Sequence, residues 1–255
     1  MQQLTFNIRD FIAVSHAQPM DAPWPTRCPF ELSFSRRPLT RCQTAAITGT
    51  GIYMITKLPQ REIIYLGLFR PLAGDIIADR WARHLQTITW RGARIGLGPA
   101  PKGRTDLKVA RRRDNLLSVA SHPELQSVIR AAYDHDREAR YTSTGNDTSV
   151  NRTRFANEHW AEFSAATQES LLDNFEIDLI RMHLPPDQAT ADHQIEEIER
   201  RLLSEYKPVC NYQYRAKAHH GQRHRNAEAL LIQSVRQVMT AVTSYDATHR
   251  ITLKP

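Results

Sequence analysis

A carboxylate inside an apolar helical face is the first residue of this chain that could do chemistry. In HQIEEIERRLLSEYKP, five residues form a stripe about 140° wide at ~100° per residue: Ile195, Ile198, Leu202, Leu203 and Tyr206. Glu199 falls inside this stripe, whereas the other charged residues of the segment fall outside it. Because a carboxylate buried alone would cost several kcal/mol, Glu199 must be paired, protonated or bound to a metal. A salt bridge to an arginine at the edge of the core and a functional role both stay open.

An arginine and a histidine at helical spacing form a second candidate. In GDIIADRWARHLQTITW, apolar residues recur at the spacing of one helical face: Ile77, Trp81, Leu85 and Ile88. Arg80 and His84 lie four residues apart on one flank of that face, so both would project at its rim and could meet one phosphate together. A surface arginine and a hydrogen-bonded histidine would show the same spacing.

Two tyrosines beside glycines form a third candidate. GIYMITKLPQREIIYLG predicts a β-hairpin of two apolar, β-branched runs around a turn that contains Pro59. Tyr53 follows Gly51-Ile52 in the first run, and Tyr65 precedes Leu66-Gly67 in the second. Either tyrosine could be an ordinary core aromatic with its hydroxyl at the edge, or a hydroxyl that takes part in catalysis.

The elements that would position these residues predict an α+β fold. NFEIDLIRMHLP alternates apolar and acidic residues, which predicts a strand near Phe175–His183, and a helix from about Ala191 to Tyr206 ends before Pro208. We expect an N-terminal arm at 1–46, where prolines interrupt regular elements, a core at 47–90 and 173–214, and a mostly helical insertion at 91–172. Its helical pieces lie around Asp114–Tyr133 and Asn151–Leu172, separated by the loop YTSTGNDTSVN. A basic segment and a C-terminal helix, Ala227–Val242, occupy 215–255.

In their order along the chain, these residues resemble the GIY-YIG nuclease superfamily. The resemblance rests on Gly51-Ile52-Tyr53, eleven residues, Tyr65-Leu66-Gly67, Arg80 and His84, then Glu199 nine residues before Pro208, and Asn211. It covers about Gly49–Ile88 and Phe175–Tyr214. The chain departs from the pattern in having YLG in place of YIG, Leu68-Phe69-Arg70 where many relatives have a polar or basic residue, and a longer gap before Glu199.

The resemblance implies a small three-stranded antiparallel sheet flanked by helices, which hydrolyses DNA phosphodiesters with one divalent metal, Mg²⁺ or Mn²⁺. It assigns the metal to Glu199, the general base to Tyr53, and the orientation of the water or the phosphate to Tyr65. Arg80 would stabilise charge in the transition state. His84 would position the phosphate or Tyr53, and Asn211 would hold the site together by hydrogen bonds.

The charge of the chain favours a polyanionic partner, here double-stranded DNA. The 255 residues include 34 Lys and Arg against 27 Asp and Glu, a formal net charge of +7. Arg91–Arg113 carries eight basic residues and one acid, and it either reads bases or contacts only phosphates. The candidate DNA-binding residues are Arg70, Arg91, Arg94, Lys102, Arg104, Lys108, Arg111, Arg112, Arg113, Arg223 and Arg225. His219, His220 and His224 lack the cysteine or acidic partners of a zinc site and are expected to face DNA instead.

A separate chain with an insertion and basic flanks looks most like the type II restriction endonucleases of this fold, which act as homodimers because a palindrome needs two active sites. A cognate DNA methyltransferase would fit such a system. The alternatives are a repair or mobile-element nuclease that recognises DNA structure or a modified base, and a catalytically inactive DNA-binding protein. With no signal peptide, no apolar run of the ~18 residues that span a bilayer, and three cysteines without metal-ligand spacing, we expect a cytoplasmic location without membrane partners.

Overall fold

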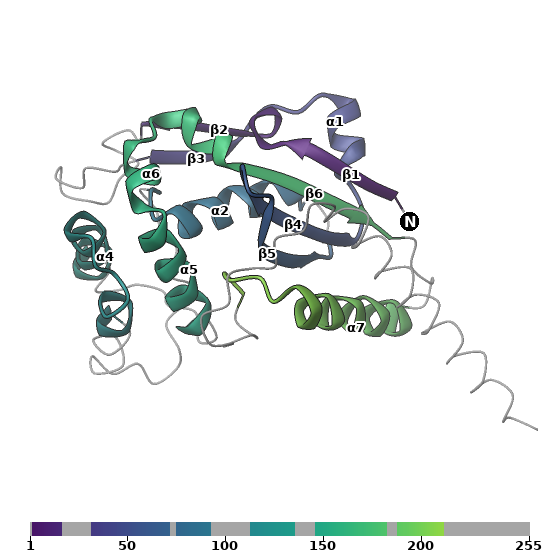
Figure 1. Ribbon diagram of the computed structural model, residues 1–255. Coiled ribbons are helices and arrows are strands. Elements are labelled where there is room, and N and C mark those ends of the chain that lie inside the picture. The colour runs from purple at the N-terminus through teal and green to yellow at the C-terminus, as the bar shows by residue number, and fades with distance from the viewer. Residues whose placement is uncertain are drawn as a thin grey trace, which may run out of the picture.

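A four-stranded antiparallel sheet forms the centre of the protein. The structure is a computed structural model that describes residues 2–16, 32–71, 75–92, 113–135, 146–182 and 188–211. The strands lie in the order β1 (Gln2–Asn7), β6 (Phe175–Arg181), β4 (Gly51–Lys57) and β5 (Glu62–Phe69), as Figure 1 shows. The predicted hairpin is β4–β5 and the predicted strand is β6, so the α+β class is confirmed.

The expected sheet of three strands is wrong, because residues 1–46 contribute a fourth. Strand β1 pairs with β6 from Gln2 opposite Arg181 to Asn7 opposite Glu176. The prolines that favoured an irregular arm begin only at Pro23, and the sequence QQLTFN far before them contains none. Phe6 anchors this strand by packing on Trp81, with their ring centroids 5.9 Å apart.

The remaining elements near the N-terminus pack beside the sheet. A 3₁₀ turn, η1 (Ile8–Asp10), leads into β2 (Ile12–His16), which pairs with β3 (Leu32–Arg36) in a separate two-stranded sheet. Helix α1 (Arg41–Ala46) follows, with Thr40 as its N-cap in a capping box with Gln43.

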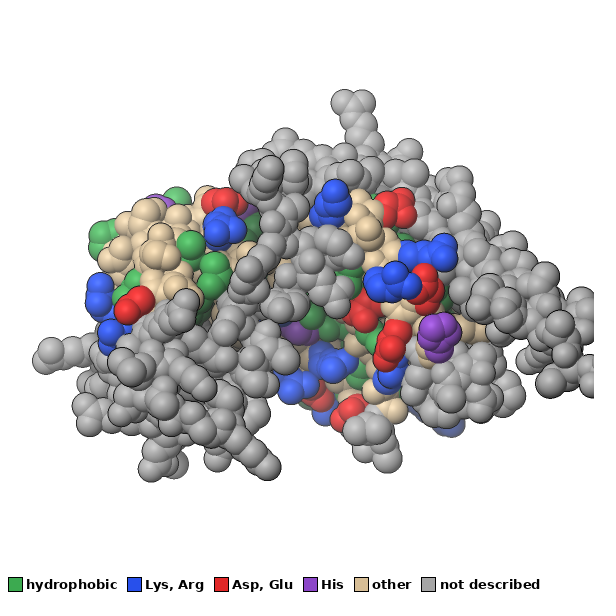
Figure 2. All heavy atoms as spheres, turned by 90° about the horizontal axis from the view of Figure 1, so that it is seen from below, with side chains coloured by type: hydrophobic (Ala, Val, Ile, Leu, Met, Phe, Trp, Pro, Cys, Tyr) green, Lys and Arg blue, Asp and Glu red, His purple; other side chains and the backbone are tan. Residues whose placement is uncertain are grey.

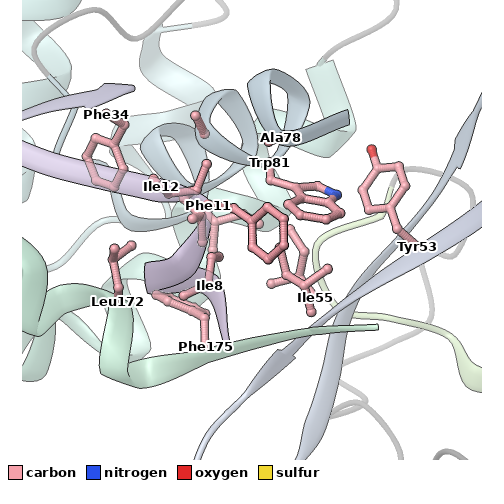
Figure 3. Packing of buried hydrophobic residues seen from close by; sticks show 14 of the residues in the cluster. Ile8, Phe11, Ile12, Phe34, Tyr53, Ile55, Ala78, Trp81, Leu172 and Phe175 are labelled. Atoms are coloured by element: carbon pink, nitrogen blue, oxygen red, sulfur yellow. The ribbon is translucent and has the colours of Figure 1, made fainter. Parts of the chain in front are cut away.

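Two helices cover opposite faces of the sheet. Helix α2 (Ile77–Thr89) lies on the face that carries Tyr53 and Ile55, and its buried residues include the predicted apolar face: Ile77, Trp81, Leu85 and Ile88. Helix α7 (Gln188–Tyr206) covers the other face, below β4 and β5 in Figure 1, through the predicted stripe: Ile195, Ile198, Leu202, Leu203 and Tyr206. Figure 3 shows Tyr53 at the border of the first cluster, with its hydroxyl directed away from Ile55.

The described part of the insertion is helical and packs against the core. It comprises α4 (Pro123–His135), α5 (Asn146–Glu158), α6 (Trp160–Ala165) and the 3₁₀ helix η2 (Gln168–Asn174). The first expected piece is interrupted before Pro123, since a residue preceding proline disfavours helical geometry, and α5 begins inside the expected polar loop. Helix α5 lies against α2, which brings the insertion to the edge of the core. Within the described ranges, no helix is long and apolar enough to cross a membrane.

Candidate functional site

Two tyrosines and a histidine form an aromatic cluster between the sheet and α2. Tyr53 of β4 lies opposite Gly67 of β5, and Tyr65 stands two residues earlier in β5, so both tyrosine side chains face α2. His84 of α2 lies over Tyr65, with their ring centroids 4.4 Å apart. Its Nε2 atom is 2.7 Å from the Tyr53 hydroxyl oxygen. The hairpin register and the helix together therefore bring three predicted site residues into contact.

The glycine of each triplet removes a different obstacle. A Cβ atom at Gly67 would lie 2.6 Å from both Cζ and Oη of Tyr53, because the tyrosine ring crosses this strand position. A Cβ atom at Gly51 would lie 2.3 Å from the carbonyl oxygen of Ile180, because β6 approaches here. Gly67 thus makes room for a side chain, whereas Gly51 makes room for backbone.

The outer edge of β5 is occupied by the segment that follows α7. The amide of Cys210 donates to the carbonyl of Ile64 at 2.9 Å. Leu66 then pairs with the side chain of Asn211, whose Oδ1 accepts from the Leu66 amide at 2.9 Å and whose Nδ2 donates to the Leu66 carbonyl at 2.7 Å. Asn211 therefore takes the place of a neighbouring strand at this position of β5.

Leu68 is the next residue of β5 whose backbone groups face the outer edge of the sheet. Its backbone contacts Arg80 and Glu199, which come from helices on opposite faces of the sheet. Arg80 Nη1 donates to the Leu68 carbonyl at 2.7 Å, and the Leu68 amide donates to the Glu199 carboxylate. Glu199 is half-buried, and burial raises its pKa, while the Leu68 amide and the cations of Arg70 and Arg80 act in the opposite direction. The sheet edge is thus where residues from the two faces meet.

Arg152 of α5 also belongs to this cluster, although the sequence did not single it out. Its Nη2 atom lies 3.1 Å from Nδ1 of His84, and its guanidinium carbon lies 5.0 Å from the centroid of the Tyr65 ring. A further hydrogen bond joins Arg152 to Thr87, one turn along α2. One arginine in a polar helix follows no pattern that distinguishes it from the other arginines of the chain.

Burial sets the protonation of the aromatic cluster. It raises the pKa of Tyr53 well above 10.0, with a smaller contribution from Tyr65, while Arg80 and Arg152 lower that pKa. Burial also lowers the pKa of His84 well below 6.5, and the cations of Arg152 and Arg80 lower it further. At neutral pH the cluster therefore holds a neutral tyrosine and a neutral histidine.

The candidate DNA-binding residues that the structure describes lie in two settings, one arginine in the interior and two in ion pairs. Arg91 is 5% exposed and donates to the carbonyls of Phe163 and Ala166, so its guanidinium is committed to the interior. Arg70 pairs with Glu196 at 2.8 Å, and Arg113 pairs with Asp114 at 3.4 Å.

The other predicted DNA contacts fall outside the described residues: Arg94, Lys102, Arg104, Lys108, Arg111, Arg112, Arg223 and Arg225. The histidines His219, His220 and His224 and the expected helix Ala227–Val242 also lie outside them. Over α7, Figure 2 shows basic and acidic side chains beside one another, and the exposed residues there include Glu196, Glu205, Arg200 and Arg201. This face does not form a uniformly basic surface.

Among the described residues of the site, Glu199 supplies a carboxylate. Among the residues that the structure describes, no three His, Cys, Asp or Glu side chains are grouped so that they could hold a metal ion. Mg²⁺ suits such a site, because it is commonly bound by one or two carboxylates together with water and substrate phosphates. The half-buried carboxylate of Glu199 fits this donor set.

Comparisons with protein-family models, with curated proteins and with solved structures found no match for this chain. Any functional interpretation therefore depends on the order of the residues and on their geometry. The six predicted catalytic residues lie on β4 and β5, on α2 and α7, and, for Asn211, in the segment after α7 that pairs with β5: Tyr53, Tyr65, Arg80, His84, Glu199 and Asn211.

Proposed function

We propose that this chain is a divalent-metal-dependent DNA endonuclease of the GIY-YIG type, and that it acts on double-stranded DNA as a site-specific, type II restriction enzyme. One observation carries the proposal: Arg80 and Glu199 meet at the backbone of Leu68, and His84, one helical turn from Arg80, contacts the Tyr53 hydroxyl at 2.7 Å. A hydroxyl, an imidazole, a guanidinium and a carboxylate thus share one electrostatic environment. These groups can supply the base, the metal ligand and the charge stabilisation that phosphodiester hydrolysis uses.

Glu199 would hold the metal, Mg²⁺ or Mn²⁺. Burial disfavours the charged form of the Glu199 carboxylate. A cation beside it would stabilise that charged form. When bound, the metal would neutralise charge on the phosphate and acidify nearby water. The Leu68 amide and the Arg80 side chain hold this carboxylate and its surroundings in place from the edge of β5.

The side chains of this chain would carry out the proton transfer and the charge stabilisation. As its phenolate, Tyr53 takes a proton from the attacking water, whose oxygen forms a bond to phosphorus while the bond from phosphorus to the leaving oxygen breaks. The leaving oxygen takes a proton from solvent. Arg80 donates hydrogen bonds to the charge that develops on the phosphate oxygens, and the Tyr65 hydroxyl orients the water or the phosphate. His84 holds the Tyr53 oxygen in place.

Deprotonation of Tyr53 to the phenolate is the energetically unfavourable step of this mechanism. Burial raises its pKa, which opposes loss of the proton at neutral pH. The cations of Arg80 and Arg152 act in the required direction, and the hydrogen bond between His84 and Tyr53 holds the oxygen beside them. Tyr53 should therefore become an effective base only when this positive environment is complete.

The test is DNA cleavage with Mg²⁺ by the wild-type chain, Tyr53→Phe, Glu199→Gln and the matched control Glu205→Gln, an exposed residue of the same helix. We expect discrete fragments from the wild type and the control. We expect activity to fall at least about 100-fold in the two site variants, as is typical when a general base is removed. Mg²⁺ should also raise the melting temperature of the wild type but not of Glu199→Gln.

Other outcomes would contradict the proposal in different ways. Cleavage only of branched or modified DNA would indicate a structure- or modification-specific nuclease. Binding without cleavage would indicate an inactive DNA-binding protein. Full activity in Glu199→Gln would remove this carboxylate from the mechanism.

A further inference from the structure

The two ring nitrogens of His84 have different partners. Nε2 faces the hydroxyl of Tyr53 at 2.7 Å, and Nδ1 faces Nη2 of Arg152 at 3.1 Å. We propose that Arg152 is a positioning residue that fixes His84 as the tautomer with its proton on Nε2, so that His84 donates a hydrogen bond to the Tyr53 oxygen. The consequence for catalysis rests on the proposed function, whereas the tautomer itself does not.

The assignment follows from the donors that the two side chains possess. A guanidinium carries only N–H donors, so the contact with Arg152 requires an acceptor on His84, which is an unprotonated Nδ1. A neutral imidazole with a bare Nδ1 carries its proton on Nε2. The opposite tautomer, and the doubly protonated ring, would each place an N–H group of His84 against an N–H group of Arg152.

The guanidinium is held in the orientation that this contact needs. Arg152 also donates to the hydroxyl of Thr87, and it lies over the ring of Tyr65. The preceding residue, Asn151, donates to the carbonyl of Asn211 at 2.8 Å, which ties this turn of α5 to the segment along β5. Arg152 is therefore fixed to the core from several sides, although it belongs to the insertion.

The direction of the hydrogen bond decides what Tyr53 can do. If His84 accepted from Tyr53, the hydroxyl proton would be directed toward the imidazole and the tyrosine oxygen would lose a stabilising donor. With His84 as the donor, the Tyr53 oxygen receives a hydrogen bond that persists in the phenolate, and its own proton is directed away from the imidazole. The groups that face Tyr53 are Tyr65 from β5, Arg80 and His84 from α2, and Arg152 from α5. Arg152 would thus prepare the base through His84, without contacting the water itself.

The experiment is nitrogen-15 NMR of the histidine side chains in the full-length chain without DNA, with the His84 signals identified from a His84→Asn sample. In the wild type at pH 7.5, Nε2 should have the chemical shift of a protonated ring nitrogen and Nδ1 that of an unprotonated one. The reverse pattern, or an even mixture, would overturn the proposal. Because the wild-type spectrum is decisive once His84 is assigned, this result does not depend on whether an Arg152 variant folds.

Variants then test whether Arg152 is the cause. Arg152→Met should yield a mixture of His84 tautomers and lower the rate of DNA cleavage at pH 7.5 by about tenfold or more, the loss expected for one charge-assisted hydrogen bond. Its cleavage should recover at higher pH, and Arg152→Lys should restore part of the rate. Arg154→Met, an exposed arginine of the same helix, should retain the wild-type spectrum. An unchanged tautomer and rate in Arg152→Met would reject Arg152 as the positioning residue.

The two proposals fail separately. If the wild type cuts no DNA but shows the Nε2-protonated form of His84, the proposed function fails and the tautomer assignment stands. If it cuts DNA with the opposite tautomer, the reverse holds.

Discussion

At the level of single residues, the position of Tyr53 depends on Gly67, which has no side chain. Its ring crosses Gly67 and is 1% exposed, so it has no open space into which it could turn. His84 holds the hydroxyl end. A methyl group on residue 67 would therefore compete directly with the tyrosine for the same volume.

Gly67→Ala should lower the free energy of unfolding by about 1–3 kcal/mol, the usual cost of inserting a methyl group into a packed site. Urea denaturation measures this loss. In a Tyr53→Ala background the same substitution should cost much less, because the ring that it displaces is gone. Equal costs in both backgrounds would contradict this packing.

Gly51→Ala is the matched control, since its added methyl would meet the Ile180 carbonyl oxygen at 2.3 Å. The backbone of a central strand moves less readily than a side chain to make room for an added methyl group. The cost should therefore be at least as large as for Gly67→Ala, and it should not decrease in the Tyr53→Ala background.

His84 should make the stability of the protein depend on pH. Its pKa is lowered in the folded chain, so below the unfolded value of about 6.5 the unfolded chain binds a proton that the folded chain resists. The stability that neutral His84 contributes is fully present above about pH 6.5 and is lost as the pH falls toward its lower folded pKa.

The free energy of unfolding of the wild type minus that of His84→Asn should thus be smaller at pH 5 than at pH 8. Urea titrations at the two pH values measure this difference. His159, whose pKa burial also lowers, is present in both proteins and cancels. A difference that does not change with pH would contradict a neutral, buried His84.

At the level of elements, the outer edge of β5 is built from side chains. Asn211 uses both ends of its amide on Leu66, a pairing that only an amide side chain of this length can make there. Asn211→Asp retains an acceptor but loses the donor, and it places a carboxylate against the Leu66 carbonyl. We expect a loss of about 1–3 kcal/mol in the free energy of unfolding, together with faster hydrogen exchange of the Leu66 amide.

Asn157→Asp provides the matched control, because the Asn157 side-chain oxygen accepts from the amides of Ser121 and His122, and a carboxylate can still do so. That variant should lose little stability. Similar losses in both variants would mean that the donor function of Asn211 is unimportant.

Elements whose buried face appears in the sequence as a periodic pattern of apolar residues could be predicted. The hairpin, the Trp81 face of α2 and the α7 stripe around Glu199 are of this kind, because side chains three or four apart share a helix face. Strand β1 was missed because its partner is distant: Thr5 bonds Asp178, 173 positions away. Arg152 and Arg91 were missed or misjudged for a related reason, since tertiary contacts alone distinguish a buried, bonded arginine from a solvated one.

For the molecule as a whole, the described face over α7 does not account for the binding of a polyanion. The net charge is +7, yet basic and acidic residues alternate over α7, and most of the basic run Arg91–Arg113 lies outside the described residues. If that run contacts phosphates, binding to DNA should weaken steeply with added salt, because each contact releases counterions.

Replacing Arg111 and Arg112 together by Gln should reduce the slope of log K against log salt by up to about 0.9 for each lost phosphate contact. Fluorescence anisotropy at several salt concentrations measures it. The control replaces Arg9 and Arg36, which pair with Asp173 and Asp79, and so changes the net charge equally. If the two double variants change the slope equally, net charge and not this segment controls binding.

The outer edge of β5 has one more consequence, for the behaviour of the chain in concentrated solution. An open strand edge is a template on which another chain can add a strand, which leads to aggregation. Here the carbonyl of Ile64 and both backbone groups of Leu66 and Leu68 are bonded to Cys210, Asn211, Arg80 and Glu199. The residues proposed to carry out hydrolysis therefore also keep molecules apart, and substitutions at Asn211 should reduce solubility as well as activity.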